Sequence, residues 1–111
     1  MAVTHPTRDQ IQLDNLFAAL GNPLRLQVVR ELAADGGERR CSSFFPEVAK
    51  STLTHHWRVL REAGLICQRP SGRELLLSLR RDDVEARFPG LLDAVLGAAE
   101  SESAKDPAAV R

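Results

Sequence analysis

The chain has 111 residues, of which 43% are hydrophobic and 27% charged, and its formal net charge is zero. This length suits one domain rather than two, and the composition is globular rather than disordered or fibrous. No apolar run reaches the ~18 residues that span a bilayer, and the first residues lack the features of a secretory signal, so we expect a cytoplasmic protein without a membrane partner.

The first third of the chain predicts two helices. Residues 1–8 are expected to form a flexible arm, and apolar residues with helical spacing follow from Asp9 to Leu20. The Gly-Asn-Pro run at 21–23 then separates two helices, because glycine suits the residue after a helix, asparagine an N-cap and proline a first turn. The second helix is predicted to end near Ala34, before Asp-Gly-Gly.

A short third helix and a longer fourth one are predicted next. The third covers Arg40–Phe45, with Phe44 or Phe45 in the core, and Pro46 interrupts it. Ser51 is the predicted N-cap of the fourth helix, which Gly64 ends. Within that helix Leu53, Trp57 and Leu60 recur at i, i+4 and i+7, the rhythm of one buried stripe.

Two extended segments joined by a turn follow the fourth helix. Cys67–Pro70 and Arg73–Arg80 flank Ser-Gly at 71–72, a strong turn signal. Leucines alternate with polar residues in the second segment, although Leu76 breaks the alternation without an explanation from the pattern. A helix restarts at Asp82 and a last one runs to about Ala99, so the domain is predicted to cover residues 9–99 and a disordered tail residues 100–111.

This order of elements predicts a winged helix-turn-helix, mainly α with a small β-hairpin (α-α-α-α-β-β-α). The first and last helices carry more apolar surface than one small domain needs, which favours a homodimer through both helices. The alternative is that the two stripes pack only within their own domain. The predicted interface consists of Leu13, Leu16, Phe17, Leu20, Leu91, Leu92, Val95 and Leu96.

The fourth helix and the hairpin together predict a surface that binds double-stranded DNA. Residues 38–81 carry nine Lys/Arg against four Asp/Glu, whereas residues 1–37 carry three against four and residues 82–111 three against seven. A helix that is apolar behind and rich in donors in front fits the major groove, and arginines at a wing reach the minor groove or phosphates. The alternative is a solvated surface, and for His56 a structural contact. The predicted contacts are Lys50, Ser51, Thr52, Thr54, His55, His56, Arg58, Arg69 and Arg73.

The motifs resemble those of the ArsR/SmtB family of bacterial repressors. Leu20–Leu32 resembles the opening of the family's second helix, Ser51–Ile66 its DNA-reading helix, and Arg69–Arg73 lies where the family places the tip of its wing. The resemblance covers roughly residues 10–98. It implies a dimeric winged-helix transcription factor, usually a repressor that a ligand releases from DNA.

The metal sites of the family are incomplete in this chain. Metal-sensing members often carry Cys-x-Cys on the third helix, where this chain has only Cys41, and others use Asp and His on the last helix, where this chain has no histidine. Cys41 and Cys67 are most simply free thiols in a reducing compartment. His5 and Cys41 are weak metal candidates, no cofactor is required, and zinc or nickel stays open as an effector, as does thiol oxidation.

The sequence therefore predicts a sequence-specific DNA-binding regulator, most simply a repressor, that binds an inverted repeat as a homodimer. The alternative is a winged helix used for protein contact, with a second regulatory protein as its partner. An enzyme is not expected, because the chain has no glycine-rich phosphate loop and no catalytic triad constellation.

Overall fold

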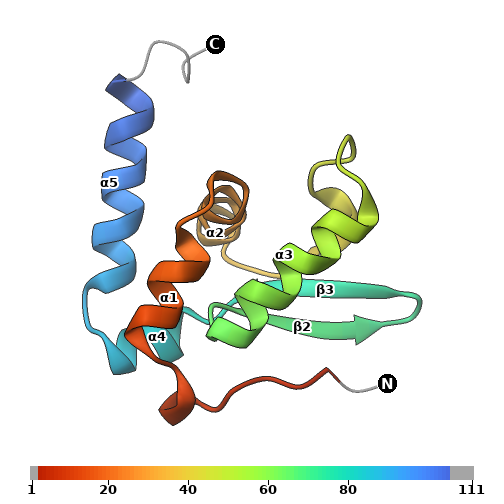
Figure 1. Cartoon of the computed structure of the whole chain (residues 1–111), viewed down its shortest axis with the longest axis horizontal. Coiled ribbons are helices and arrows are strands. Elements are labelled where there is room, and N and C mark those ends of the chain that lie inside the picture. Colours follow the sequence, from red (N-terminus) through yellow and green to blue (C-terminus); the bar gives the residue numbers. More distant parts are fainter. Residues whose placement is uncertain (1–2, 106–111) are drawn as a thin grey trace.

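The computed structural model describes residues 3–105 and shows helices packed beside a small sheet, with the last helix standing to one side (Figure 1). This is the predicted winged helix-turn-helix, mainly α with a short β-hairpin. The elements, in chain order, are a 3-10 turn η1 (Arg8–Gln10), α1 (Leu13–Leu20), α2 (Pro23–Asp35), β1 (Arg39–Arg40), a 3-10 turn η2 (Cys41–Ser43), α3 (Lys50–Ala63), β2 (Ile66–Ser71), β3 (Glu74–Leu79), α4 (Arg81–Arg87) and α5 (Leu91–Lys105).

The boundary between α1 and α2 follows the predicted chemistry. The Asn22 side chain accepts hydrogen bonds from the backbone amides of Leu24 (2.9 Å) and Arg25 (3.1 Å), and Pro23 occupies the first helical position. The start of α1 differs from the prediction, because the chain is extended at Ile11 and Gln12 instead of helical from Asp9. Ile11 leaves the helical path to become a buried core residue.

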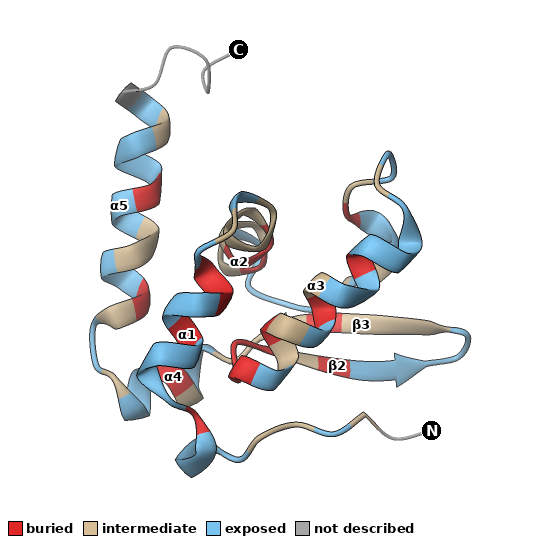
Figure 2. Cartoon of the chain, viewed as in Figure 1, coloured by how far each residue is buried: buried red, intermediate tan, exposed pale blue. Residues whose placement is uncertain are grey.

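The core lies where α1, α2 and α3 meet the base of the sheet (Figure 2). Leu53, Trp57 and Leu60 of α3 are buried, as their spacing predicted. Trp57 packs against Phe44, with ring centroids 5.5 Å apart. The buried stripe of α3 therefore anchors this helix and leaves its opposite side to solvent.

The predicted third helix over Arg40–Phe45 is reduced to the single 3-10 turn η2. Arg40 belongs to strand β1, and Phe45 adopts a positive φ of 44°, a strained value for a bulky residue. Because β1 pairs with β3, Arg40 and its neighbour are drawn into the sheet instead of a helix. Phe44 is the phenylalanine that reaches the core.

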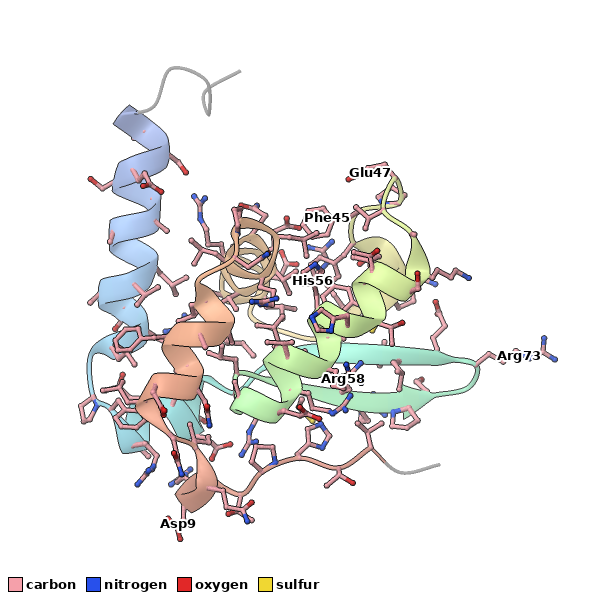
Figure 3. The ribbon with its side chains drawn as sticks, viewed as in Figure 1. Asp9, Phe45, Glu47, His56, Arg58 and Arg73 are labelled. Atoms are coloured by element: carbon pink, nitrogen blue, oxygen red, sulfur yellow. The ribbon has the colours of Figure 1, made fainter. Side chains whose placement is uncertain are left out.

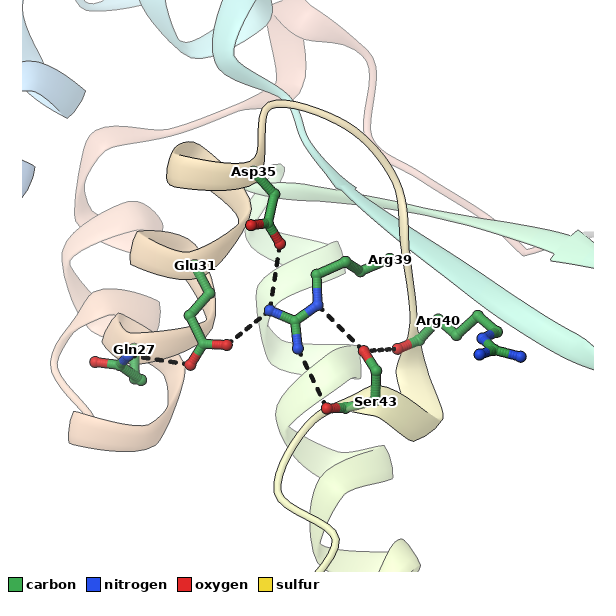
Figure 4. Close-up of polar contacts among 6 residues, drawn as sticks. All are labelled: Gln27, Glu31, Asp35, Arg39, Arg40 and Ser43. Carbon is green, nitrogen blue, oxygen red and sulfur yellow. Dashed lines mark hydrogen bonds and ion pairs between the residues drawn. The ribbon is translucent and has the colours of Figure 1, made fainter.

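Arg39 holds this irregular segment in place through side-chain bonds (Figure 4). Its guanidinium donates to Glu31 at 2.7 Å and Asp35 at 3.3 Å on α2, and to the hydroxyl and carbonyl oxygens of Ser43, both at 3.2 Å. It also lies 3.9 Å from the ring centroid of Phe44. These contacts replace the backbone bonds that a helix would have supplied, and they connect α2 to the approach of α3.

The sheet has the order β1-β3-β2, with all pairs antiparallel. The β2–β3 hairpin turns between Ser71 and Glu74, as the Ser-Gly signal predicted, and forms the wing. The third strand β1 was not predicted. It makes β3 the central strand, which explains why Leu76 is apolar: this half-buried residue has neighbours on both sides, Arg40 and Arg69.

Both ends of the domain extend beyond the predicted limits of residues 9 and 99. Residues 3–8, part of the expected flexible arm, contact the body: the Pro6 carbonyl accepts from Arg80 at 2.7 Å, and Arg8 pairs with Asp83 at 2.8 Å. Helix α5 continues through Lys105, so residues 100–105 are helical instead of disordered, and residues 106–111 of the expected tail lie outside the described residues. Within residues 3–105, no helix is both long and apolar enough to cross a membrane.

Candidate nucleic-acid interface

Helix α3 presents a continuous polar surface to solvent. Ser51, Thr52, Thr54, His55 and Arg58 are all exposed, whereas the apolar stripe behind them is buried. The hydroxyl of Thr54 donates to the carbonyl of Lys50 at 2.8 Å, which leaves its oxygen free to accept. Arg58 extends from the same surface (Figure 3), with its Nη2 3.4 Å from Nδ1 of His55. The helix thus offers donors and acceptors without requiring any rearrangement of its fold.

The start of α3 is uncapped. Ala49, and not Ser51, occupies the N-cap position, and no side chain among the described residues accepts from the first-turn amides. The prediction of Ser51 as the cap is therefore wrong by two residues, because the helix already begins at Lys50. Free first-turn amides, together with the helix dipole and the exposed Lys50, make this end favourable for an anion.

His56 is half-buried, and its ring contacts Arg25 of α2. Its Nδ1 accepts a hydrogen bond from Nη1 of Arg25 at 3.0 Å, and Arg25 also donates to the carbonyls of Ala19 (2.7 Å) and Ala18 (3.3 Å). Burial, followed by the charge of Arg25, lowers the pKa of His56 below its ordinary value of 6.5. The geometry assigns His56 the structural contact that the sequence left as its alternative.

Arg69 and Arg73 occupy different environments in the wing. Arg73 lies at the tip and points away from the body (Figure 3). Arg69 donates from Nε and Nη2 to both carboxylate oxygens of Glu38, each at 2.8 Å. This bidentate bond raises the pKa of Arg69 and lowers that of Glu38. Arg73 is free to meet a ligand, whereas Arg69 already has a partner.

Most cationic side chains of residues 3–104 donate to an oxygen atom of the protein. Three donate to none: Lys50, Arg58 and Arg73, all on α3 or at the wing tip. The others bond as follows: Arg8 and Arg80 to Asp83, Arg25 to Ala19, Arg30 to Ser103, Arg39 to Glu31, Arg40 to Glu74, Arg61 to Gln68, Arg69 to Glu38, Arg81 to Asp93, and Arg87 to Ile11.

Lys50 and Arg73 also share a groove between α3 and the wing. The groove has a volume of about 380 Å³, and Trp57, Leu75 and Ser42 lie among its lining residues. Its lining combines apolar side chains with two cations, two hydroxyl groups and the carboxylate of Glu74. A chain of phosphates that crosses from the helix to the wing would pass over it.

The two weak metal candidates both contact Gln68. Nε2 of His5 accepts from the backbone amide of Gln68 at 2.9 Å, and the Cys41 sulfur lies 3.9 Å from Nε2 of the Gln68 side chain. Burial raises the pKa of the Cys41 thiol, which disfavours the thiolate that binds metals. In the described part of the chain, no group of three or more His, Cys, Asp or Glu side chains is placed to hold a metal ion, and a metal role for His5 and Cys41 stays a prediction.

The predicted dimer residues divide into three groups by their burial. Leu16, Leu20 and Leu92 are buried in the core of their own protomer, so their assignment to an interface is corrected. Leu13 and Phe17 are 41% and 53% exposed, and they are the exposed large hydrophobic residues of the described chain. Leu91, Val95 and Leu96 of α5 are half-buried. Apolar residues of α1 therefore lie both on its buried side and on its exposed side.

Comparison with known proteins shows related regulators. No protein-family model matches the chain. The chain is 35% identical over 89 residues to the HTH-type transcriptional regulator YceK of Bacillus subtilis (strain 168), covering 78% of this chain and 88% of YceK. The crystal structure of an ArsR family transcriptional regulator matches with a TM-score of 0.59 at 21% identity, covering 84% of this chain and 97% of that one.

The transcriptional repressor BigR from Xylella fastidiosa matches with a TM-score of 0.57 at 26% identity, covering 77% of this chain and 83% of BigR. The chain belongs to the HTH-type transcriptional regulators, and its fold is that of the ArsR family. As a member of this family it is a DNA-binding transcriptional regulator and not an enzyme. In this context α3 is the reading helix and the β2–β3 hairpin is the wing.

The sequence did not reveal two features of this interface. The uncapped start of α3 depends on where the helix begins, and Ser51 suggested a later start than the structure shows. The bond between Arg69 and Glu38 joins residues 31 positions apart, and no local pattern indicates it. The excess of positive charge in residues 38–81 was visible, but which cations stay free was not.

Proposed function

We propose that this regulator is a sequence-specific repressor that binds an inverted-repeat operator as a homodimer. The observation that carries the proposal is the placement of Lys50, Arg58 and Arg73. These cations donate to no oxygen atom of residues 3–104, and all three belong to the reading helix or the wing. A duplex laid against α3 would supply the missing anionic partners as phosphates and base edges.

The reading helix meets the major groove in this proposal. Arg58 and His55 project from its exposed surface towards base edges, and Arg58 is the residue suited to a bidentate bond with guanine. The backbone phosphates pass the uncapped start of α3 and the groove between Lys50 and Arg73. Arg73 then reaches the adjacent minor groove from the wing tip.

A homodimer brings two such surfaces to one operator. Phe17 and Leu13 of α1 are exposed large apolar residues, and the half-buried Leu91, Val95 and Leu96 supply apolar surface on α5. Burying this surface against a second copy is the simplest reason for its exposure. A twofold dimer requires an inverted repeat with half-site centres about 10 bp apart or a multiple of that spacing. Repression is proposed because the similar BigR is a repressor.

The test compares Arg58→Ala with Arg81→Ala on a duplex selected from random DNA by the wild-type protein. Arg81 is a matched control, because it is an exposed arginine that pairs with Asp93 of α5. We expect Arg58→Ala to weaken binding by about tenfold or more and Arg81→Ala to change it less than about twofold, measured by fluorescence anisotropy. Equal losses of DNA affinity in the two variants would contradict the assignment of α3 as the reading helix.

The salt dependence separates this function from protein recognition. Wild-type affinity for the selected duplex should fall steeply as salt rises, and Arg73→Ala should reduce the slope of log K against log salt by about 1. Weak binding to every duplex at low salt, lost at physiological salt, would instead support a winged helix that contacts a second regulatory protein. Repression itself is measured with a reporter gene behind the selected operator.

A further inference from the structure

Gln68 is the buried polar residue at the point where the wing leaves the body. The residue is 4% exposed, and it is the one buried polar residue among those that the structure describes. The residues of β2 that follow it, Arg69, Pro70 and Ser71, are all exposed. Gln68 therefore marks the boundary between the packed and the free parts of the hairpin.

The side chain of Gln68 is bonded to the reading helix. Its Oε1 accepts from Nη1 of Arg61 on α3 at 2.6 Å. Nε of Arg61 is buried and has no hydrogen-bond partner among the described residues, so the bond from Nη1 is the polar contact between this arginine and the sheet. A buried bond to a charged donor contributes more than a surface one, and its loss leaves two polar groups unsatisfied.

The adjacent residue secures the opposite side of the sheet. Side chains alternate along a strand, so Arg69 faces away from Gln68 and from α3. Its bidentate bond to Glu38 reaches across β3 to the segment that leads into β1. Consecutive residues of β2 thus connect the hairpin to α3 on one side and to the β1 segment on the other.

We propose that Gln68 and Arg69, with their partners Arg61 and Glu38, form a wing root that sets the direction of the wing relative to the reading helix. These are positioning residues, and they act on DNA through Arg73. The inference rests on the proposed function, because it concerns how Arg58 and Arg73 are aligned on one duplex. It also assigns Arg69 a role other than the DNA contact predicted from the sequence.

The geometry of the hairpin makes this root necessary. The tip at Gly72 lies four residues beyond Gln68, a lever of about 13 Å at ~3.3 Å per residue. A rotation of about 10° at the root would displace Arg73 by roughly 2 Å, which exceeds the tolerance of a hydrogen-bonded site of about 0.5 Å. A two-stranded ribbon has little stability of its own, so the free part of the wing cannot correct such a rotation.

The experiment is a pair of double-mutant cycles. Gln68→Met keeps the side-chain volume and removes the hydrogen bonds, and Ser78→Ala on β3 is the control within the same sheet. We expect Gln68→Met to weaken operator binding about fivefold when Arg73 is present and less than about twofold in an Arg73→Ala background. Combined with Arg58→Ala, its fivefold effect should persist in full, because Arg58 does not belong to the wing.

Three further variants test the remaining members of the wing root. Arg61→Met should reproduce the effect of Gln68→Met and add nothing to it. If the Arg69–Glu38 pair holds the wing in position, the single variants Glu38→Gln and Arg69→Ala should each weaken operator binding. If Arg69 instead bound DNA directly, Glu38→Gln would release it, remove a negative charge and tighten binding, and that outcome would overturn the assignment of Arg69.

Hydrogen exchange on the free protein tests the root without DNA. Gln68→Met should accelerate exchange of the amides in residues 69–77 and leave those of α2 unchanged. Two results would contradict the proposed role of the wing root. One is unchanged exchange in Gln68→Met, and the other is a loss of operator binding by Gln68→Met that persists in full in the Arg73→Ala background. A wild-type protein that binds no duplex would contradict the proposed function instead, and the exchange result would still decide the structural part of the inference.

Discussion

Nδ1 of His56 lies 3.0 Å from Nη1 of Arg25, and the same guanidinium donates to the last carbonyls of α1. An arginine can only donate, so the imidazole accepts through Nδ1 and is neutral in this arrangement. His56 therefore joins α3 to α1 and α2, while the adjacent His55 is exposed on the reading surface. Of the two neighbouring histidines, one makes a contact inside the domain and the other faces solvent.

The stability of the domain should decrease in mild acid. Burial and then Arg25 lower the pKa of His56, and burial followed by Arg80 and Arg61 lowers the pKa of His5. A histidine whose pKa is lower in the folded state than in the unfolded one is protonated first by the unfolded chain, so stability is full above about pH 6.5 and declines below it.

Urea unfolding at about pH 7.5 and about pH 5 measures this effect. We expect a lower midpoint in acid for the wild type and a smaller difference after His5→Gln and His56→Gln are combined. Carboxylates that pair with arginines, such as Asp83, contribute their own loss only at lower pH, because their pKa is also lowered. If the loss of stability in acid is unchanged in the double variant, neither histidine is its source.

Gly64 cannot be replaced by alanine without a large loss of stability. Its φ is +89°, and an added Cβ would lie 2.5 Å from Cγ1 of the buried Ile11. Both the backbone conformation and the space therefore require glycine. Gly72 at the wing tip is a matched control, because its φ is +61° and nothing lies within 4 Å of an added Cβ.

Thermal or urea unfolding should show a loss of about 3 kcal/mol or more for Gly64→Ala and about 1 kcal/mol for Gly72→Ala. The comparison isolates the contact with Ile11 from the cost of the positive φ. Similar losses in the two variants would show that the chain before α1 moves away from α3 easily.

Arg39 should matter more for stability than its neighbour Arg40. Replacing Arg39 with methionine removes its bonds to Glu31, Asp35 and Ser43 and its contact with Phe44, while Arg40 pairs only with Glu74 at the surface. We expect Arg39→Met to cost about 1–3 kcal/mol and Arg40→Met less than about 0.5 kcal/mol in urea unfolding. Equal effects would mean that the segment before α3 does not depend on the Arg39 contacts.

Phe17→Ser should shift the protein from dimer to monomer. Phe17 is the more exposed of the two large apolar residues on α1, so its replacement removes apolar area from the proposed interface without opening the core. Sedimentation equilibrium measures the change, and Asn15→Ser, at an exposed position of the same helix, is the control. A wild-type protein that sediments as a monomer would contradict the proposed homodimer. If the Phe17→Ser variant still sediments as a dimer, the interface lies elsewhere.

The sequence was most informative where a local pattern determines the structure. The spacing of Leu53, Trp57 and Leu60 predicted the buried side of α3, and Asn22 with Pro23 predicted the start of α2, because each depends on residues within one or two helical turns. The strand β1 was missed because its pairing with Leu76 and Leu77 is formed by residues far away in the chain.

The limits of the prediction follow from the same cause. Apolar spacing shows that a helix has a buried side, but it does not show what covers that side. For this reason Leu16, Leu20 and Leu92 were assigned to a dimer although they lie in their own core. Likewise the charge excess of residues 38–81 did not reveal that Glu38 would occupy Arg69.

The bond between His5 and the amide of Gln68 also has a consequence for association between molecules. Strand β2 is at the edge of the sheet, and its outward amide at Gln68 is occupied by His5. Two residues further on, the next outward position of the alternating ladder is Pro70, which has no N–H to offer. At these two positions the edge offers no free N–H to an incoming strand, which discourages sheet extension between copies of the protein when they crowd together on a chromosome.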